Sequence, residues 1–108
     1  MPCKYVIHTV APEWYRDYEI SKEELLKNCY LSSLKLAEEY NLKTIAFPCI
    51  GMGIYSCPKD IGAKIALKTV LNYIESSTIE KVFFVCYETH LYDYYTEILR
   101  ELLEYEDF

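Results

Sequence analysis

The segment Thr44–Asp60 carries the residues best suited to bind a small anion. Its apolar run Ile45–Ile50 is typical of a β-strand, and Pro58 is favourable at the start of a helix. Gly51 and Gly53 lie between them and have no Cβ, so the backbone can turn with positive φ and approach a phosphate closely. The first N–H groups of a helix have no internal partner and carry the positive end of its dipole. The segment therefore predicts an anion site made by backbone groups, with an ordinary tight turn as the alternative.

Two widespread phosphate-binding motifs do not fit this loop. The spacing is too long for a Walker-type P-loop, and the lysine of that motif is missing. The dinucleotide pattern Gly-x-Gly-x-x-Gly fails at Ser56.

Composition excludes several other classes of function. A net charge of −6 without a Lys/Arg cluster argues against binding to nucleic acid. Five cysteines without a Cys-x-x-Cys pair predict neither a disulfide framework nor a zinc site, and nothing indicates another cofactor. The sequence shows no leader peptide at Met1 and no apolar run long enough to cross a bilayer, so we expect a cytoplasmic protein without a membrane partner.

The chain alternates strand-like and helix-like segments. Apolar runs at 4–10, 44–50 and 82–87 predict strands, and because they do not alternate with polar residues we expect them to be buried on both faces. Helices are expected over 21–41, 58–75 and 91–104, the first opened by a capping box of Ser21 and Glu24. Helical spacing predicts one buried face on each of the first two, made of Leu26, Cys29, Tyr30, Ser33, Leu34 and Ala37, and of Ile61, Ile65, Ala66, Val70 and Tyr73.

This order predicts an α/β fold with about three mostly parallel strands joined by right-handed crossovers. Ligands of such sheets bind at the carboxyl ends of the strands, here residues 10–12, 50–56 and 86–88.

Four motifs in this order resemble the macro domain. They are the runs Tyr5–Pro12, Leu26–Tyr30, Ile45–Pro58 and Val82–Val85. Members of that family bind ADP-ribose and related molecules, and some hydrolyse ADP-ribose from proteins or deacetylate O-acetyl-ADP-ribose. The resemblance covers the family's C-terminal portion only, so it implies one truncated three-layer domain over residues 1–108.

The resemblance also implies the site. The backbone of Gly51, Met52, Gly53, Ile54 and Tyr55, continued by Ser56, would wrap the diphosphate, with Tyr55 beside the distal ribose. Tyr87 would lie against adenine. The strands and the loop that usually supply catalytic residues are not matched, and Tyr55 stands where one branch of the family has an acidic group.

We therefore expect a protein that binds ADP-ribose, or a related nucleotide diphosphate, without efficient hydrolysis. One alternative is an ADP-ribosyl or O-acetyl-ADP-ribose hydrolase completed by another subunit or by a further segment. The other is a non-binding interaction module that self-associates.

Further side chains have alternative roles. His8 is expected to be a buried core residue rather than a base, and His90 an ordinary exposed histidine. Cys57 is expected to be a core residue, with a thiol of lowered pKa at a helix N-terminus as the alternative.

Aromatic residues suggest contacts beyond the core. Trp14, Tyr15 and Tyr18 could either close over a ligand or cover the core. Of Tyr92, Tyr94 and Tyr95, at least one must be exposed on the last helix. Together with the unmatched strands, this predicts a homo-oligomer, most simply a twofold dimer.

Overall fold

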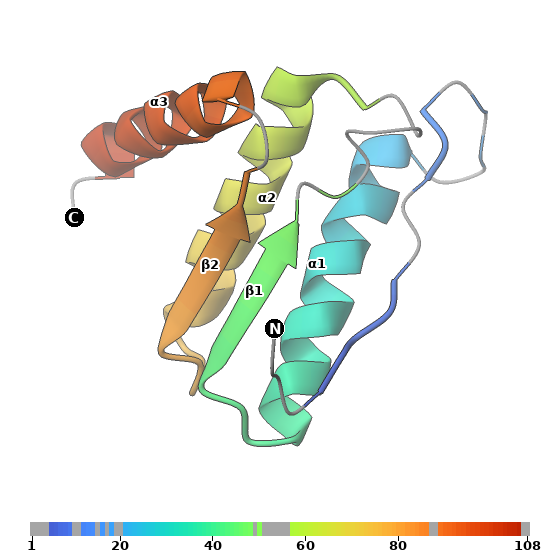
Figure 1. Ribbon diagram of the computed structural model, residues 1–108, viewed down its shortest axis with the longest axis vertical. Coiled ribbons are helices and arrows are strands. Elements are labelled where there is room, and N and C mark those ends of the chain that lie inside the picture. Colours follow the sequence, from blue (N-terminus) through green and yellow to red (C-terminus); the bar gives the residue numbers. More distant parts are fainter. Residues whose placement is uncertain are drawn as a thin grey trace.

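The computed structural model describes residues 5–9, 12–14, 16, 18, 21–48, 50, 57–86 and 89–106. They form three helices and two strands in the order α1 Lys22–Glu39, β1 Thr44–Pro48, α2 Lys59–Ile74, β2 Lys81–Val85 and α3 Thr89–Glu106 (Figure 1). The predicted α/β class is confirmed.

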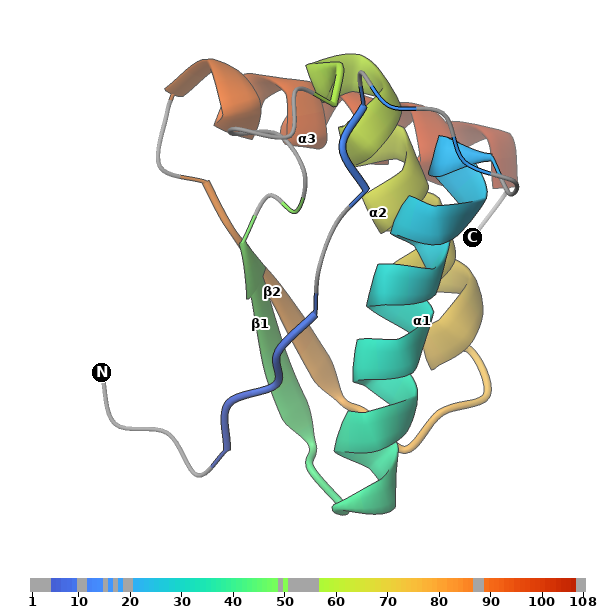
Figure 2. The same ribbon diagram turned by 90° about the vertical axis from the view of Figure 1, so that its right-hand side faces the viewer.

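The two strands form a parallel sheet. They pair in register from Thr44 with Lys81 to Pro48 with Val85. A parallel pair needs a long crossover, and α2 provides it. Helices α1 and α2 lie side by side on one face of the sheet, while α3 crosses the end toward which both strands point (Figures 1 and 2).

Only one face of this sheet is covered. Ile45, Phe47, Val82 and Phe84 alternate along the strands and pack into the core under α1 and α2. On the other face, Phe83 remains 54% exposed. The expectation that the strands are buried on both faces is wrong for the described residues, because none of their helices lies against that face (Figure 2).

The first expected strand, at 4–10, differs from the prediction. Its described part, residues 5–9, has no strand assignment, and the sheet of the described residues contains β1 and β2 alone. Val6 is 68% exposed and His8 is also exposed, so the expectation of a buried His8 is wrong. Tyr5 instead stacks on Tyr40, with ring centroids 5.0 Å apart. β-propensity reflects packing against neighbouring strands, and no described strand is paired with this segment.

Helix α1 matches its prediction closely. The Ser21 Oγ accepts a hydrogen bond from the Glu24 N–H at 3.1 Å, which caps the helix. Asn41 follows its other end with φ of 57°. Its buried face consists of the six residues expected, Leu26, Cys29, Tyr30, Ser33, Leu34 and Ala37.

Helix α2 buries most of the face expected: Ala66 and Val70 lie in the core, and Ile65 and Tyr73 pack partly buried against it. The buried residues are Gly62, Ala63, Ala66, Leu67, Thr69 and Val70. Ile61 was expected inside but is 36% exposed. Small residues at the contact let α2 approach its neighbours closely, and this turns Ile61 outward.

Helix α3 buries Leu91, Tyr95 and Leu102. Tyr92 and Tyr94 are 61% and 40% exposed. The prediction that the three tyrosines cannot all face inward is confirmed.

Candidate functional site

The expected binding residues follow two strand ends that lie side by side. Pro48 and Val85 are partners in the last register pair of the sheet. Both Gly51–Ser56 and Tyr87 lie outside the described residues. The described flanks of the site are Ile50, Cys57 and Cys86.

The start of α2 forms the base of the candidate site. Its N-cap is Pro58, which offers no side-chain cap, and the Gly62 N–H donates to the Pro58 carbonyl at 2.9 Å. The positive end of the helix dipole is therefore located where the Gly51–Ser56 segment joins the helix. Asp60 and Lys59 carry opposite charges in this first turn, so attraction for an anion must come mainly from backbone groups.

Cys57 is a buried thiol at this junction. Its side chain contacts the Pro58 carbonyl at 3.5 Å and is buried with the core cluster. Burial, together with the nearby carboxylates of Asp60 and Glu23, raises the pKa of Cys57 from 9.0 to about 11. The thiol is protonated at neutral pH, so the alternative of a lowered pKa at the helix N-terminus is wrong.

An aromatic residue lies beside the start of α1. Trp14 is half-buried against the core, and its carbonyl accepts a hydrogen bond from Lys22 Nζ. The packing of Trp14 against the core favours the alternative in which it covers the core over the one in which it closes over a ligand. Tyr18 accepts a hydrogen bond from the Glu13 N–H at 2.9 Å, and Tyr15 lies outside the described residues.

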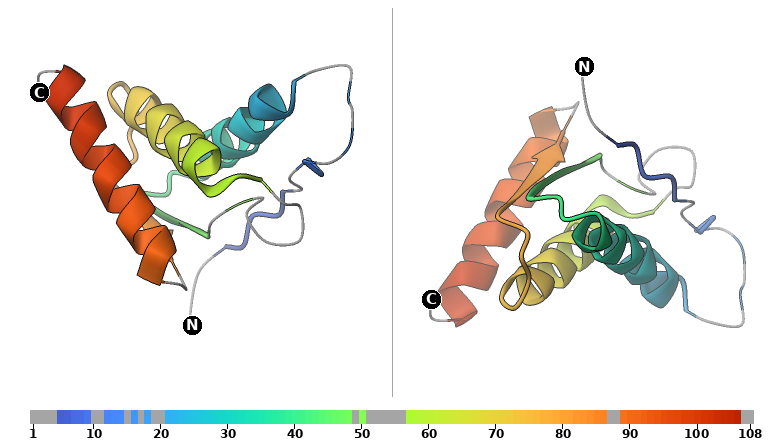
Figure 3. Two further views of the ribbon diagram at one scale, coloured as in Figure 1. Left: turned by 90° about the horizontal axis from the view of Figure 1, so that it is seen from above. Right: turned by 90° about the horizontal axis from the view of Figure 1, so that it is seen from below.

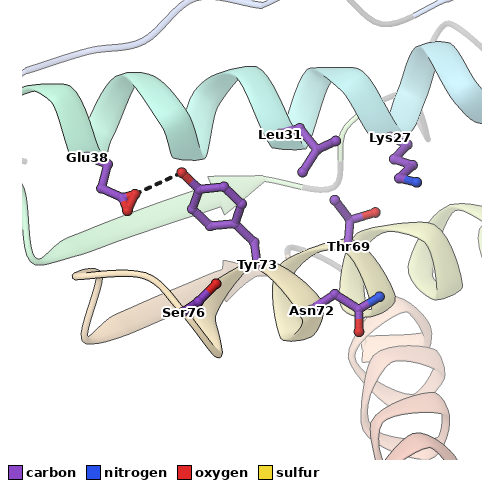
Figure 4. A pocket seen from close by; sticks show the side chains of 7 residues that line it. All are labelled: Lys27, Leu31, Glu38, Thr69, Asn72, Tyr73 and Ser76. Atoms are coloured by element: carbon purple, nitrogen blue, oxygen red, sulfur yellow. Dashed lines mark hydrogen bonds between the residues drawn. The ribbon is translucent and has the colours of Figure 1, made fainter.

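A groove between α1 and α2 is a separate feature. It has a volume of about 490 Å³ and is lined by Lys27, Leu31, Glu38, Thr69, Asn72, Tyr73 and Ser76 (Figure 4). Tyr73 donates a hydrogen bond to Glu38 at 2.9 Å, and Ser77 Oγ donates to the same carboxylate at 3.3 Å. Burial and the bond to Glu38 raise the pKa of Tyr73. These hydrogen bonds join α1 to the end of α2, so the groove follows the line of contact between the two helices.

Sequence reasoning missed the bonds that Glu38 and Lys22 make. Both are charged residues of a kind common on helices, and no local motif marks a partner 35 residues away such as Tyr73. Only the packing of α1 on α2 brings Glu38 and Tyr73 together.

The described residues offer neither a metal site nor a membrane-spanning helix. They contain no group of three or more His, Cys, Asp or Glu side chains that could hold a metal ion. None of the helices they form is long and apolar enough to cross a membrane.

The architecture defines an α/β protein of the class that places ligands where parallel strands end. The family model of the macro domain matches residues 1–66. A macro domain-containing protein of Caldanaerobacter subterraneus subsp. tengcongensis is 44% identical, over 94% of this chain and 58% of the relative. The O-acetyl-ADP-ribose deacetylase of Escherichia fergusonii is 42% identical, over 94% of this chain and 57% of the relative.

Solved structures give the same result. A macrodomain mutant of Oceanobacillus iheyensis with ADPR matches with a TM-score of 0.85 and 36% identity, over 90% of this chain and 52% of that one. The same macrodomain with ADP matches equally well, over 50% of its chain.

The chain belongs to the macro domain family. The resemblance stated from the motifs is thereby confirmed. The chain spans between half and three-fifths of the length of these relatives.

Proposed function

We propose that this chain binds ADP-ribose, or a related nucleotide diphosphate, where β1 and β2 end. The observation that carries this proposal is the match, at 36% identity and a TM-score of 0.85, to a macrodomain solved with ADPR. The start of α2 supports it, because a helix N-terminus directly after Gly51–Ser56 can receive a diphosphate. In this proposal residues 1–108 act as a single truncated domain.

The residue roles are part of the proposal. Backbone N–H groups of Gly51, Met52, Gly53, Ile54, Tyr55 and Ser56 hold the diphosphate, and Tyr87 stacks on adenine. Such stacking is worth about 1–3 kcal/mol. The net charge of −6 does not favour an anion, so affinity depends on these local backbone groups.

Calorimetry with ADP-ribose tests binding. We expect saturable heat with the unmodified chain and at least a tenfold loss with Gly53→Val, because a branched side chain would fill the space that a phosphate needs. Thr78→Val is the matched control, since Thr78 is exposed in the connector at the opposite end of the strands and the same residue is introduced. Absence of heat at millimolar ADP-ribose would contradict the proposal.

Efficient hydrolysis is not part of this function. Cys57, the buried thiol next to the site, is protonated at neutral pH, and the resemblance matches no catalytic loop. The E. fergusonii relative bears the name O-acetyl-ADP-ribose deacetylase, so O-acetyl-ADP-ribose is the substrate to test. Turnover by the isolated chain above the uncatalysed rate would favour the hydrolase alternative.

Self-association is a second proposal, which does not depend on ligand. Phe83, on the uncovered sheet face, and Tyr92, on α3, are both more than half exposed. Where such side chains form a contiguous apolar patch, the patch marks contact with another chain. We also propose a cytoplasmic location, consistent with the buried Cys57 thiol, which forms no disulfide.

A further inference from the structure

Two carboxylates lie at the end of the molecule that holds the candidate site. Glu23 is in the first turn of α1, and Asp60 is in the first turn of α2. Figure 1 shows that both helices begin at the end toward which β1 and β2 point, and the view from above in Figure 3 looks onto these two starts. Two negative charges, one from each helix, are therefore located at the end where the strands finish.

Cys57 is an internal probe of the electrostatic potential at this place. It directly follows Gly51–Ser56 in the chain, and its side chain is buried with the core. After burial itself, the causes that raise its pKa are the carboxylate of Asp60 and then that of Glu23. Both carboxylates therefore disfavour a further negative charge at the point where the expected binding segment joins α2.

Two lysines lie in the same helical turns. Lys22 Nζ donates a hydrogen bond to the Trp14 carbonyl, and Lys59 directly precedes Asp60. The charges that act most on Cys57 are nevertheless the two carboxylates. An anionic ligand at this junction is therefore attracted by backbone N–H groups and repelled by Glu23 and Asp60.

The ligands of the proposed function differ in charge at the diphosphate. In ADP-ribose both phosphates are esterified, and each carries one negative charge. The terminal phosphate of ADP is a monoester, which carries a second negative charge above about pH 6. A carboxylate near the diphosphate therefore destabilises the complex with ADP more than the complex with ADP-ribose.

We propose that Glu23 and Asp60 are specificity-determining residues, which favour nucleotide diphosphates with both phosphates esterified over those that end in a free phosphate. This inference rests on the function proposed above and names the ligand class of the same site. The backbone N–H groups provide affinity for both kinds of ligand, and the two carboxylates discriminate between them by charge.

This role can be separated from a purely structural one. Acidic side chains in the first turn also stabilise a helix by interacting with its dipole. That stabilisation changes the free energy of unfolding, but it does not change the ratio of the dissociation constants of two ligands that bind the same folded chain. The ratio of the Kd for ADP to the Kd for ADP-ribose is therefore the quantity to measure.

Coulomb's law gives the size of the effect. At about 10 Å in water, one unit charge changes the affinity for another about twofold. Removing one carboxylate should lower the ratio about twofold, and removing both should lower it about fourfold at low ionic strength. At about 1 M salt the Debye length falls to about 3 Å, so the ratios of the variants should approach that of the unmodified chain.

Calorimetry with ADP and with ADP-ribose, at about pH 8 and without divalent cations, tests the proposal. The variants are Glu23→Gln, Asp60→Asn and the two together, which remove the charges and keep the shapes of the side chains. Glu39→Gln and Glu75→Gln are the matched controls, since both residues are exposed at the other ends of α1 and α2 and each substitution removes the same net charge. The controls should keep the ratio of the unmodified chain.

The outcomes separate this inference from the proposed function. Retained binding of ADP-ribose shows that a variant is folded. If the variants bind ADP-ribose with the ratio of the unmodified chain, or if the controls change the ratio equally, the role of Glu23 and Asp60 is overturned while ADP-ribose binding stands. No heat from the unmodified chain with ADP-ribose overturns both.

Discussion

The two faces of the β1–β2 sheet differ in what covers them. Toward α1 and α2, Phe47 is 3% exposed and packs edge-on against Tyr30, with ring centroids 4.9 Å apart. On the other face, Phe83 keeps more than half of its surface exposed. Both faces carry large apolar side chains, so an apolar run in the sequence does not report how many faces the domain itself buries.

The difference in burial between the two faces of the sheet has an energetic consequence. Apolar surface contributes to folding in proportion to the area removed from water, at about 25 cal/mol per Å². The covered face therefore stabilises the single chain, whereas the uncovered face can stabilise an assembly. Substitutions on the two faces should separate these effects.

The largest difference is expected between Tyr30→Ala and Phe83→Ala. Tyr30 is fully buried between Phe47 and Phe84, so its truncation should lower the free energy of unfolding by about 3–5 kcal/mol. Phe83→Ala should cost less than about 1 kcal/mol in the single chain. Urea unfolding at low protein concentration measures both, and equal losses would contradict the distinction between the faces.

The next effect concerns Cys57, which lies buried where the covered core reaches the candidate site. Its pKa is raised from 9.0 to about 11, so folding favours the neutral thiol. This stabilisation is complete below pH 9 and is lost as the pH rises from 9 to 11, by about 2 kcal/mol.

The measurement is the free energy of unfolding against pH for the unmodified chain and for Cys57→Ala. The difference between the two should shrink over pH 9 to 11 by the amount given above. A difference that stays constant over this range would show that Cys57 is not held neutral.

A smaller effect is expected at the start of α1, one of the two covering helices. Ser21→Ala removes the cap of the Glu24 N–H and should cost about 1 kcal/mol. Ser32→Ala makes the same replacement at an exposed position within α1 and should be neutral or slightly stabilising. Thermal unfolding gives the change in Tm for each of the two variants. Equal changes in Tm would exclude the loss of the helix cap as the cause.

The smallest effect is expected on the outer side of the covering helices. Tyr73→Phe removes one hydrogen bond to Glu38 and should cost about 0.5 kcal/mol, since the groove is open to water. Urea unfolding gives the value. A loss as large as that of Tyr30→Ala would mean that the contact between α1 and α2 stabilises the fold as much as the covered face of the sheet does.

Prediction from sequence succeeded where a single element determines the pattern. The apolar stripe of α1 and its cap at Ser21 follow from helical periodicity and local hydrogen bonding, and both are confirmed. The α/β class follows from the order of elements.

Prediction failed where burial depends on distant parts of the chain. The segment at 5–9 has strand-like residues, but its pairing depends on a neighbour that the described residues do not supply. Ile61 looks like a core residue, yet the small side chains of Gly62 and Ala63 set the contact of α2. The pKa of Cys57 depends on burial and on Glu23 from α1, which the local helix-dipole argument does not include.

The binding roles of the central site residues, Gly51–Ser56 and Tyr87, stay predictions. The motif that indicated Gly51–Ser56 is local in the sequence, and the residues on either side of it, Ile50 and Cys57, lie where β1 ends and α2 begins. The roles of Gly51, Gly53 and Tyr87 depend on a ligand, so binding experiments must test them.

The most direct test of the account is an NMR titration of the labelled chain with ADP-ribose. We predict saturable amide shifts at Gly51, Gly53, Tyr87 and the first turn of α2, with none at Asn72 and Ser76 of the α1–α2 groove. Shifts confined to that groove, or no shifts at millimolar ADP-ribose, would contradict the claim that the strand ends form the binding site.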